Sequence, residues 1–330
     1  MVRSSVVIVS PSLAAANNGN WQTARRWATL LRSSHDVRIA TSWTGNESDR
    51  DTVMLALHAA RSAGAIAAWT EHHGRGLGVV LTGTDLYGEF ADRPEVARSL
   101  ALAQRIVVLQ DQAPLALPPP LRDKTRVVYQ STPSRRALPK TRRWLRAVAV
   151  GHLRTVKAPD TLFAAAHRLQ GREDIQLRHV GEADGHWADQ VRATAASCPA
   201  YRWLGPLPHG EACRLIQRAH VLVHPSLAEG GAHVVMEAVR SGTPVLASHI
   251  PGNVGMLGTD YDGYFPPGDA AALARLLEQC RTEQAEGRDD PAATLLGRLR
   301  AQCDARAALF DPQAEQRALL HLVQDLRDPR

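Results

Sequence analysis

Short apolar runs alternate with amphipathic stretches along nearly the whole chain, and this alternation restricts the fold more than any other feature. Such a pattern predicts βαβ units, in which parallel strands are joined by helices that cover the sheet. The alternation lapses once, at residues 131–143, where prolines and basic residues occur without a period, as is typical of a linker. With 330 residues, each half is long enough to bury its own core. We therefore predict an α/β protein with two Rossmann-like, doubly wound parallel-sheet domains that face a central cleft.

The predicted elements divide the chain into an N-terminal domain over residues 1–140, a C-terminal domain over 141–310 and a last helix over 311–330. We expect this last helix to pack back toward the N-terminal domain. The predicted strands lie at 6–9, 37–41, 53–57, 79–81, 106–109, 127–129, 145–150, 176–180, 201–204, 221–224 and 244–247. The predicted helices lie at 21–31, 59–69, 95–103, 160–169, 187–196, 211–219, 234–240, 270–280 and 312–326. In such sheets the loops that follow the strands are expected to bind the ligand.

The composition is that of a globular protein, with 44% hydrophobic and 22% charged residues. No apolar run approaches the roughly 20 residues of a membrane span, and the N-terminal run is too short for a signal peptide. The four cysteines lack metal-type spacing, so we expect reduced thiols. A net charge of +6 would suit a nucleic acid, a membrane surface or an anionic small molecule, but the basic residues are scattered. We expect a cytoplasmic protein with no nucleic acid partner and no stable membrane association.

The segment from His220 to His249 carries the strongest functional signal. It predicts a buried strand that ends near His224, a loop with Gly230 and Gly231, and a helix that begins near Ala232. Glycines before a helix let the backbone approach an anion, to which the free N–H groups and the helix dipole then point. We therefore predict that this loop binds a phosphate.

Glu237 lies in the same predicted helix, among Val235, Met236, Ala238 and Val239. An ionised carboxylate in such apolar surroundings needs strong hydrogen-bond donors. The two hydroxyls of a ribose would supply them, and so would a backbone or arginine partner. The residues alone leave both interpretations open.

Glu229 and Glu237 enclose seven residues in the pattern E-G-G-x-x-x-x-x-E, which is followed by A-x-x-S-G-T-P-V. This resembles the donor-site motif of the retaining GT-B glycosyltransferases of the large sucrose-synthase-like family. The resemblance implies a GT-B fold, a UDP-sugar donor, and no metal or cofactor. It implies that Glu237 holds the ribose and Glu229 the donor sugar. The amides of Gly230, Gly231 and Ala232 would then contact the sugar and the diphosphate.

Upstream, G-H-L-R-T-V-K at residues 151–157 resembles the G-R-L-x-x-x-K motif of that family. The resemblance implies that Lys157 stabilises the departing diphosphate, and one such donor typically contributes about 10²–10³ in rate. His152 stands where the family has arginine, and Arg154 is close enough in sequence to compensate. We assign these three residues and Glu229 to the catalytic group. Gly205 and Leu207, in L-G-P-L, resemble the loop whose backbone reads the base.

The N-terminal half contributes candidate residues for the acceptor side. Gly19 and Asn20 follow the first predicted strand and open a helix, which suits an oxyanion, although the family has two glycines here. His58 in L-H-A and Thr84 in T-G-T-D resemble two further loops of the family. A narrower resemblance, given below, implies that Asn20, Thr23, His152 and Arg154 are candidate anion contacts.

Two other motifs are not assigned a site. Asp49 and Asp51 have the D-x-D form of metal-using transferases but lie in a predicted polar loop without strand context. His72 and His73 lie in a predicted mobile loop and have no apparent third ligand, so no metal site is predicted.

A further set of short stretches, from V-I-V-S-P-S through L-T-G-T-D-L-Y to E-G-G-A-H-V-V, resembles the selenosugar synthases of selenoneine biosynthesis, over residues 6–280. This resemblance implies a UDP-N-acetylglucosamine or UDP-glucose donor, a small anionic acceptor, selenophosphate, and a carbon–selenium bond in the product. The alternatives are a transferase for a lipid or polysaccharide hydroxyl, a UDP-sugar 2-epimerase and a non-catalytic UDP-sugar sensor. The sugar, the anomeric outcome and the oligomeric state stay open.

Overall fold

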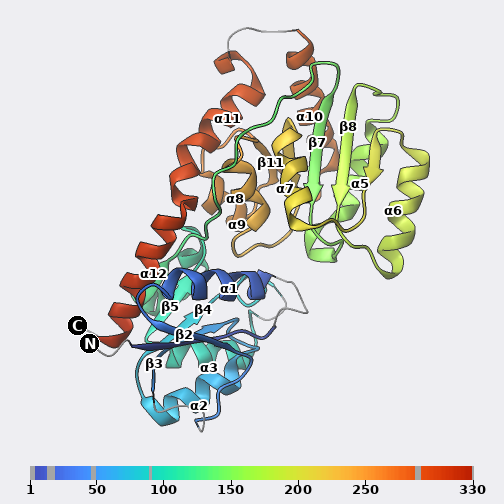
Figure 1. Cartoon of the computed structure of the whole chain (residues 1–330). Helices are drawn as coiled ribbons and strands as arrows, with labels where there is room; N and C mark the ends of the chain where they lie inside the picture. Colours follow the sequence, from blue (N-terminus) through green and yellow to red (C-terminus); the bar gives the residue numbers. More distant parts are fainter. Residues whose placement is uncertain (1–3, 13–18, 46–49, 89–90, 287–290, 329–330) are drawn as a thin grey trace. The chain divides into compact units, whose positions relative to one another are not determined.

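The computed structural model of the chain describes residues 4–12, 19–45, 50–88, 91–286 and 291–328 (Figure 1). The chain divides into two compact units. The first unit comprises Met1–Ser131, Glu229–Gly231 and Asp311–Arg330, and the second comprises Thr132–Ala228 and Ala232–Phe310. The boundary predicted after residue 140 falls within the second unit.

The first unit is built on a six-stranded sheet with the order β2-β1-β3-β4-β5-β6, in which all neighbouring strands are parallel. Val6 of β1 pairs with Val37 of β2 and with Val53 of β3. The strand order therefore reverses between β1 and β3, the kind of position at which open sheets bind ligands. The strands are β1 (Ser5–Val9), β2 (Asp36–Ala40), β3 (Asp51–Leu57), β4 (Leu77–Val80), β5 (Arg105–Val108) and β6 (Thr125–Val127).

Alternate residues of β1 face two different helical layers, as expected for a parallel sheet buried on both sides. Val6 and Ile8 belong to the apolar cluster with α1 and α12, whereas Val7 and Val9 belong to the cluster with α2 and α3. The helices of this unit are α1 (Gly19–Leu31), α2 (Ala63–His73), α3 (Pro94–Leu102), the short α4 (Pro119–Arg122) and α12 (Pro312–Arg327).

The buried carboxylate of Glu315 fixes the last helix, α12, to the first unit. It accepts hydrogen bonds from Trp27 Nε1 at 2.7 Å, from the Ser131 amide at 2.8 Å and from Arg26 Nε at 3.0 Å. The Ser131 hydroxyl donates a further bond. A buried carboxylate with this many donors is fully satisfied within the fold.

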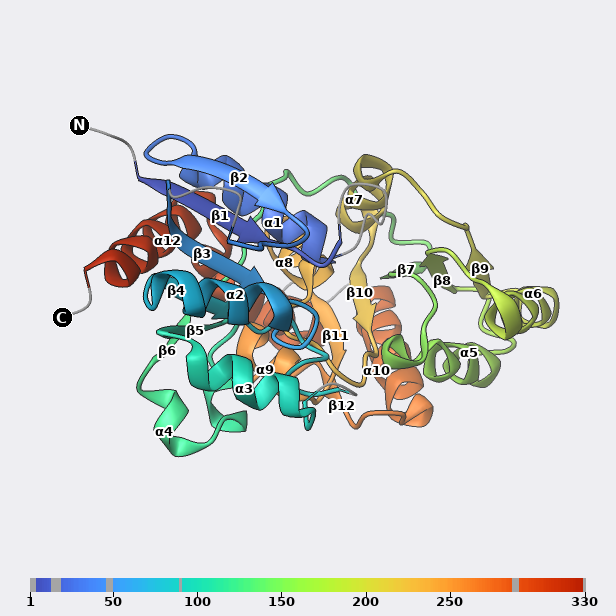
Figure 2. The same ribbon diagram turned by 90° about the horizontal axis from the view of Figure 1, so that it is seen from below.

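The second unit also contains a six-stranded parallel sheet, with the order β12-β11-β10-β7-β8-β9. Its strands are β7 (Leu145–Val150), β8 (Ile175–Val180), β9 (Tyr201–Trp203), β10 (Val221–His224), β11 (Val245–Ser248) and β12 (Tyr264–Phe265). Its helices are α5 (Pro159–Arg168), α6 (Gly185–Ser197), α7 (His209–Arg218), α8 (His233–Val239), α9 (Pro251–Leu257), α10 (Ala270–Ala285) and α11 (Leu295–Arg306). In Figure 2, α5 and α7 lie on opposite sides of β7 and β8.

Four elements, α4, α9, α11 and β12, were not predicted, and one helix begins later than predicted. The segment that forms α9 contains Pro251, Gly252 and Gly255, which disfavour a helix in isolation, yet most of its residues are buried. β12 and α11 were likewise missed. Helix α2 begins at Ala63 rather than at residue 59 because His58, with a φ of 69°, starts a turn.

Among the described residues, no helix is both long and apolar enough to cross a membrane.

Candidate functional site

The loops that follow β7, β8 and β9 meet at the carboxyl ends of these strands in the second unit. The Gly181 amide donates to the Gly205 carbonyl at 2.9 Å, and the Gly151 amide donates to the Val180 carbonyl at 2.9 Å. A Cβ atom at Gly181 would lie 1.9 Å from the Gly151 carbonyl oxygen. Glycine is therefore required for this close approach of backbones.

A pocket opens at this edge of the sheet. It is lined by His179 and His224 at the ends of β8 and β10 and by Gly151, Lys157 and Ser226 from the loops. Lys157 ends a short 3-10 turn, Thr155–Lys157, that follows β7. The buried Ser226 hydroxyl, just after β10, has no hydrogen-bond partner among the described residues. An ammonium group and an available hydroxyl in one pocket suit an oxyanion ligand. Sequence reasoning missed Ser226, although its place directly after a buried strand was a signal.

The other two residues predicted beside Lys157, His152 and Arg154, lie on the loop after β7. The His152 imidazole, with 47% of its side chain exposed, accepts a hydrogen bond from the Glu182 amide at 3.3 Å. Arg154 is exposed, and its guanidinium makes no hydrogen bond or ion pair with other described residues. Both are accessible to an incoming ligand.

The glycine loop leads into α8, which is only seven residues long. Of the three amides predicted to contact a donor, that of Ala232 donates to Met256 Sδ at 3.1 Å. Glu229, Gly230 and Gly231 precede it in the loop. Sulfur is a weak acceptor, so the bond to Met256 competes only weakly with a ligand oxygen for the Ala232 amide.

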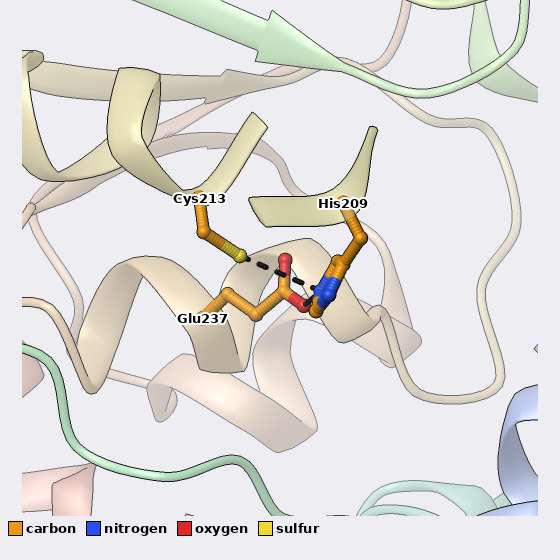
Figure 3. A group of neighbouring side chains, drawn as sticks. All are labelled: His209, Cys213 and Glu237. Carbon is orange, nitrogen blue, oxygen red and sulfur yellow. Dashed lines mark hydrogen bonds and ion pairs between the residues drawn. The ribbon is translucent and has the colours of Figure 1, made fainter. Parts of the chain in front are cut away.

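Glu237 projects from the buried part of α8, and its partner is a histidine from a different helix (Figure 3). His209 Nε2, in the first turn of α7, lies 2.6 Å from Glu237 Oε1. The Glu237 side chain is 12% exposed and that of His209 70% exposed. Among the described residues, this is the one hydrogen-bond partner of the Glu237 carboxylate. The buried carboxylate therefore depends on an exposed side chain.

Cys213 completes this group, with its sulfur 3.4 Å from His209 Nε2. The hydrogen bonds to Cys213 and to Glu237 raise the pKa of the His209 imidazole from 6.5 to about 10. One ligand atom from each of the three residues lies within 4.8 Å of the others. In tetrahedral zinc sites, nitrogen and oxygen ligands lie about 3.3 Å apart, given bonds of about 2.0–2.2 Å. The 2.6 Å contact is instead that of a hydrogen-bonded ion pair.

In the first unit, two predicted residues are brought together. His58 Nε2 lies 3.2 Å from the Thr84 hydroxyl, and burial lowers the pKa of the His58 imidazole. Asp85 orders this turn because its carboxylate accepts from the amides of Ala59 and Thr82 at 2.9 Å and 2.8 Å. The turn thus presents a histidine and a hydroxyl side by side.

The predicted anion contacts on α1 differ in their availability. Gly19 and Asn20 form the first turn of α1, and the preceding Asn17 and Asn18 lie outside the described residues. The Thr23 hydroxyl donates to the Gly19 carbonyl at 2.8 Å and accepts from Gln130 Nε2 at 2.6 Å. Thr23 is thus already engaged within the fold.

Two motifs that were expected to lie in polar loops belong to regular elements, so that expectation was wrong. Asp51 begins β3, and its buried carboxylate accepts from Arg38 Nε at 3.1 Å and from Trp43 Nε1 at 3.2 Å. Asp49 lies outside the described residues. His72 and His73 end α2 and pack against the ring of Trp43, with centroids 5.6 Å and 5.4 Å away.

The chain is similar to known glycosyltransferases in sequence and to solved structures in fold. Residues 132–293 match the family model described as glycosyl transferases group 1. A D-inositol 3-phosphate glycosyltransferase from Corynebacterium diphtheriae is 32% identical over 152 residues, which are 42% of this chain and 35% of that protein. The structure of Anabaena HepE in complex with UDP and glucose superposes with a TM-score of 0.70 at 15% identity, over 98% of this chain and 100% of that one. A sucrose-phosphate synthase from Thermosynechococcus elongatus gives a TM-score of 0.73 at 18% identity, over 98% and 99%.

The chain has the GT-B fold. The prediction of this fold from the sequence is confirmed. The group 1 match begins with Thr132, where the second unit also begins. The chain spans about a third of the length of the curated relatives that it matches.

Proposed function

We propose that this GT-B protein is a glycosyltransferase that uses a UDP-sugar. The observation that carries the proposal is Glu237, a buried carboxylate of the E-G-G-x-x-x-x-x-E motif whose one described partner is the exposed His209. A ribose would supply two hydroxyl donors in addition to His209. The group 1 match and the relatives named as glycosyltransferases support a sugar transfer, and the UDP bound in the Anabaena structure supports the UDP donor.

The remaining roles follow from the chemistry of the departing diphosphate. As the glycosidic bond breaks, its electron pair moves to a phosphate oxygen of UDP, and cations or donors near that oxygen lower the barrier. Lys157 and the Ser226 hydroxyl, in the pocket at the end of the second sheet, serve this purpose. Glu229 holds the sugar, and the backbone around Gly205 and Leu207 holds the base. The chemistry assigned here uses no metal or cofactor.

The acceptor in this proposal is selenophosphate, on the strength of the motifs shared with selenosugar synthases. Its selenium attacks the anomeric carbon of UDP-glucose or UDP-N-acetylglucosamine, a carbon–selenium bond forms, and UDP leaves. The accessible His152 and Arg154 of the second unit bind its phosphoryl group. A selenium nucleophile is largely ionised, so the step needs no strong general base.

The test is an incubation of the protein with each UDP-sugar, with and without selenophosphate, followed by mass spectrometry. UDP release that requires selenophosphate, with a selenium-bearing sugar formed, is the expected result. Release with a lipid or polysaccharide hydroxyl alone would overturn the selenium acceptor and keep the transferase. An epimerised sugar with free UDP and no acceptor would identify a 2-epimerase, and no release under any condition would contradict the proposal as a whole.

A further inference from the structure

A row of arginines lies on one face of the second sheet, away from the pocket residues described above. Arg178 on β8 pairs in register with Arg202 on β9, and Arg146 on β7 pairs with Gln176 of β8. Paired residues of neighbouring strands point to the same face, and residues two apart in a strand do so as well. Arg146, Arg178 and Arg202 therefore share one face of three adjacent strands.

This face is the one opposite α5. His179 and Tyr201, the sequence neighbours of Arg178 and Arg202, point the other way, because their rings pack against Phe163 of α5, with centroids 6.3 Å and 5.7 Å away. On the arginine face, α7 packs against β7 and ends with Arg218. Arg178 and Arg146 stay half-buried, whereas Arg202 and Arg218 are exposed.

No carboxylate balances these charges. Among the described residues, the guanidinium groups of Arg146, Arg178, Arg202 and Arg218 have no ion pair within 4 Å, and Arg178 contacts only the Gln176 side chain, at 3.5 Å. Burial and the repulsion of the three other arginines lower the pKa of the Arg178 guanidinium. Like charges held together at a desolvated surface are unfavourable without a counter-ion.

Buried donors without partners adjoin the same row. Arg146 Nε and Trp144 Nε1 are both buried and make no hydrogen bond with other described residues. The Arg146 guanidinium lies 5.6 Å from the centroid of the Trp144 ring. Buried donors in folded proteins are nearly always paired, so this set points to a missing acceptor.

We propose that the arginine face, formed by Arg146, Arg178, Arg202 and Arg218 with Trp144 beside it, binds a phosphoryl anion. A phosphoryl group carries several acceptor oxygens and multiple negative charge, and guanidinium groups bind it in paired hydrogen bonds. The site is distinct from the pocket around Lys157 and does not depend on the proposed transferase activity. The phosphoryl group can be that of a free phosphate compound or that of an anionic lipid headgroup.

Isothermal titration calorimetry with inorganic pyrophosphate tests the first source. It is run on the wild type and on Lys157→Gln, so that any binding in the pocket around Lys157 is told apart from binding at the arginine face. Flotation with phosphatidylglycerol vesicles, against phosphatidylcholine vesicles, tests the second. The variants are Arg178→Gln at the centre of the row and Arg202→Gln at its exposed end, which leaves the core untouched. The matched control is Arg192→Gln, an exposed arginine that is paired with Asp189 at 2.6 Å.

We expect wild-type protein to bind one of the two probes, more weakly as salt is added, and Arg178→Gln and Arg202→Gln to bind it about tenfold or more weakly, since charge-assisted bonds are strong. Arg192→Gln should bind as the wild type does. Pyrophosphate binding identifies a free phosphate compound as the source, and binding to phosphatidylglycerol alone identifies a lipid headgroup. Binding of neither probe, or an equal loss in Arg192→Gln, would overturn the site.

Discussion

Each unit of the protein contains a buried glutamate on a helix, but the two carboxylates are satisfied in different ways. Glu315 of the first unit receives bonds from Arg26, Trp27 and Ser131. Glu237 of the second unit is held by His209, whose side chain is 70% exposed. A carboxylate with a complete set of internal donors serves the fold, whereas one that depends on an exposed partner is available to a ligand.

The largest expected difference between the two glutamates is in stability. Glu315→Gln removes the negative charge that pairs with Arg26 and replaces one of the two acceptor oxygens with a donor, and breaking such a buried pair costs about 3–5 kcal/mol. Glu237→Gln should cost less than about 1 kcal/mol, because its partner is exposed. Urea unfolding followed by tryptophan fluorescence measures both values, and equal destabilisation by the two changes would remove the distinction.

The next largest effect is on UDP binding, for which we expect Glu237→Gln to have a larger effect than Glu315→Gln. Glu237→Gln should weaken UDP binding by about tenfold to a hundredfold, because hydrogen bonds to a charged group contribute about 1.5–3 kcal/mol. Calorimetric titration with UDP measures this change. Glu211→Gln, an exposed glutamate in the first turn of α7, is the control and should bind UDP as the wild type does. Unchanged affinity in Glu237→Gln would show that this carboxylate is not part of the donor site.

His209 should have a smaller effect on UDP binding, since it orients Glu237 rather than replacing it. We expect His209→Ala to weaken UDP binding by about three- to tenfold, the equivalent of one net hydrogen bond, and His209→Gln to restore part of the loss. The control is His167→Ala. It removes another contact between a histidine and a cysteine, in which His167 Nδ1 lies 3.1 Å from Cys198 Sγ. A loss in the control as large as that in His209→Ala would mean that His209 has no specific role.

The smallest effect is a dependence of stability on pH. The folded-state pKa of His209 is raised from 6.5 to about 10, so its ion pair contributes fully below pH 6.5 and loses its contribution as the pH rises through about 10. The difference in free energy of unfolding between wild type and His209→Gln should therefore shrink as the pH rises between these values. Urea unfolding at several pH values measures it, and a difference that grows with pH would contradict the assignment.

Much of the fold could be predicted because its signals are local. The alternation that places Val6–Val9 in a strand and 312–326 in a helix is visible within a few residues of each element. The segment of α9 escaped prediction because burial within the unit overrides the weak helix preference of Gly252 and Gly255.

The candidate site could be predicted only where one segment contained the signal. Glu237 interrupts an otherwise apolar helix, so the sequence alone indicates a buried carboxylate whose desolvation needs hydrogen-bond donors. The contact between Glu237 and His209 could not be predicted from the sequence, because it depends on how α7 packs beside α8. The four-residue spacing of His209 and Cys213 was the one local signal. The arginine face likewise depends on the register between β8 and β9, which the sequence of either strand does not contain.

If Glu237 of the second unit binds the ribose of a UDP donor, the wild-type protein must distinguish UDP from 2′,3′-dideoxy-UDP, and calorimetric titrations with the two compounds measure this. We expect UDP to bind about tenfold or more tightly than the dideoxy compound, since only UDP offers the two hydroxyls, and Glu237→Gln to remove this preference. Equal affinity of the wild-type protein for the two compounds would contradict this role of Glu237.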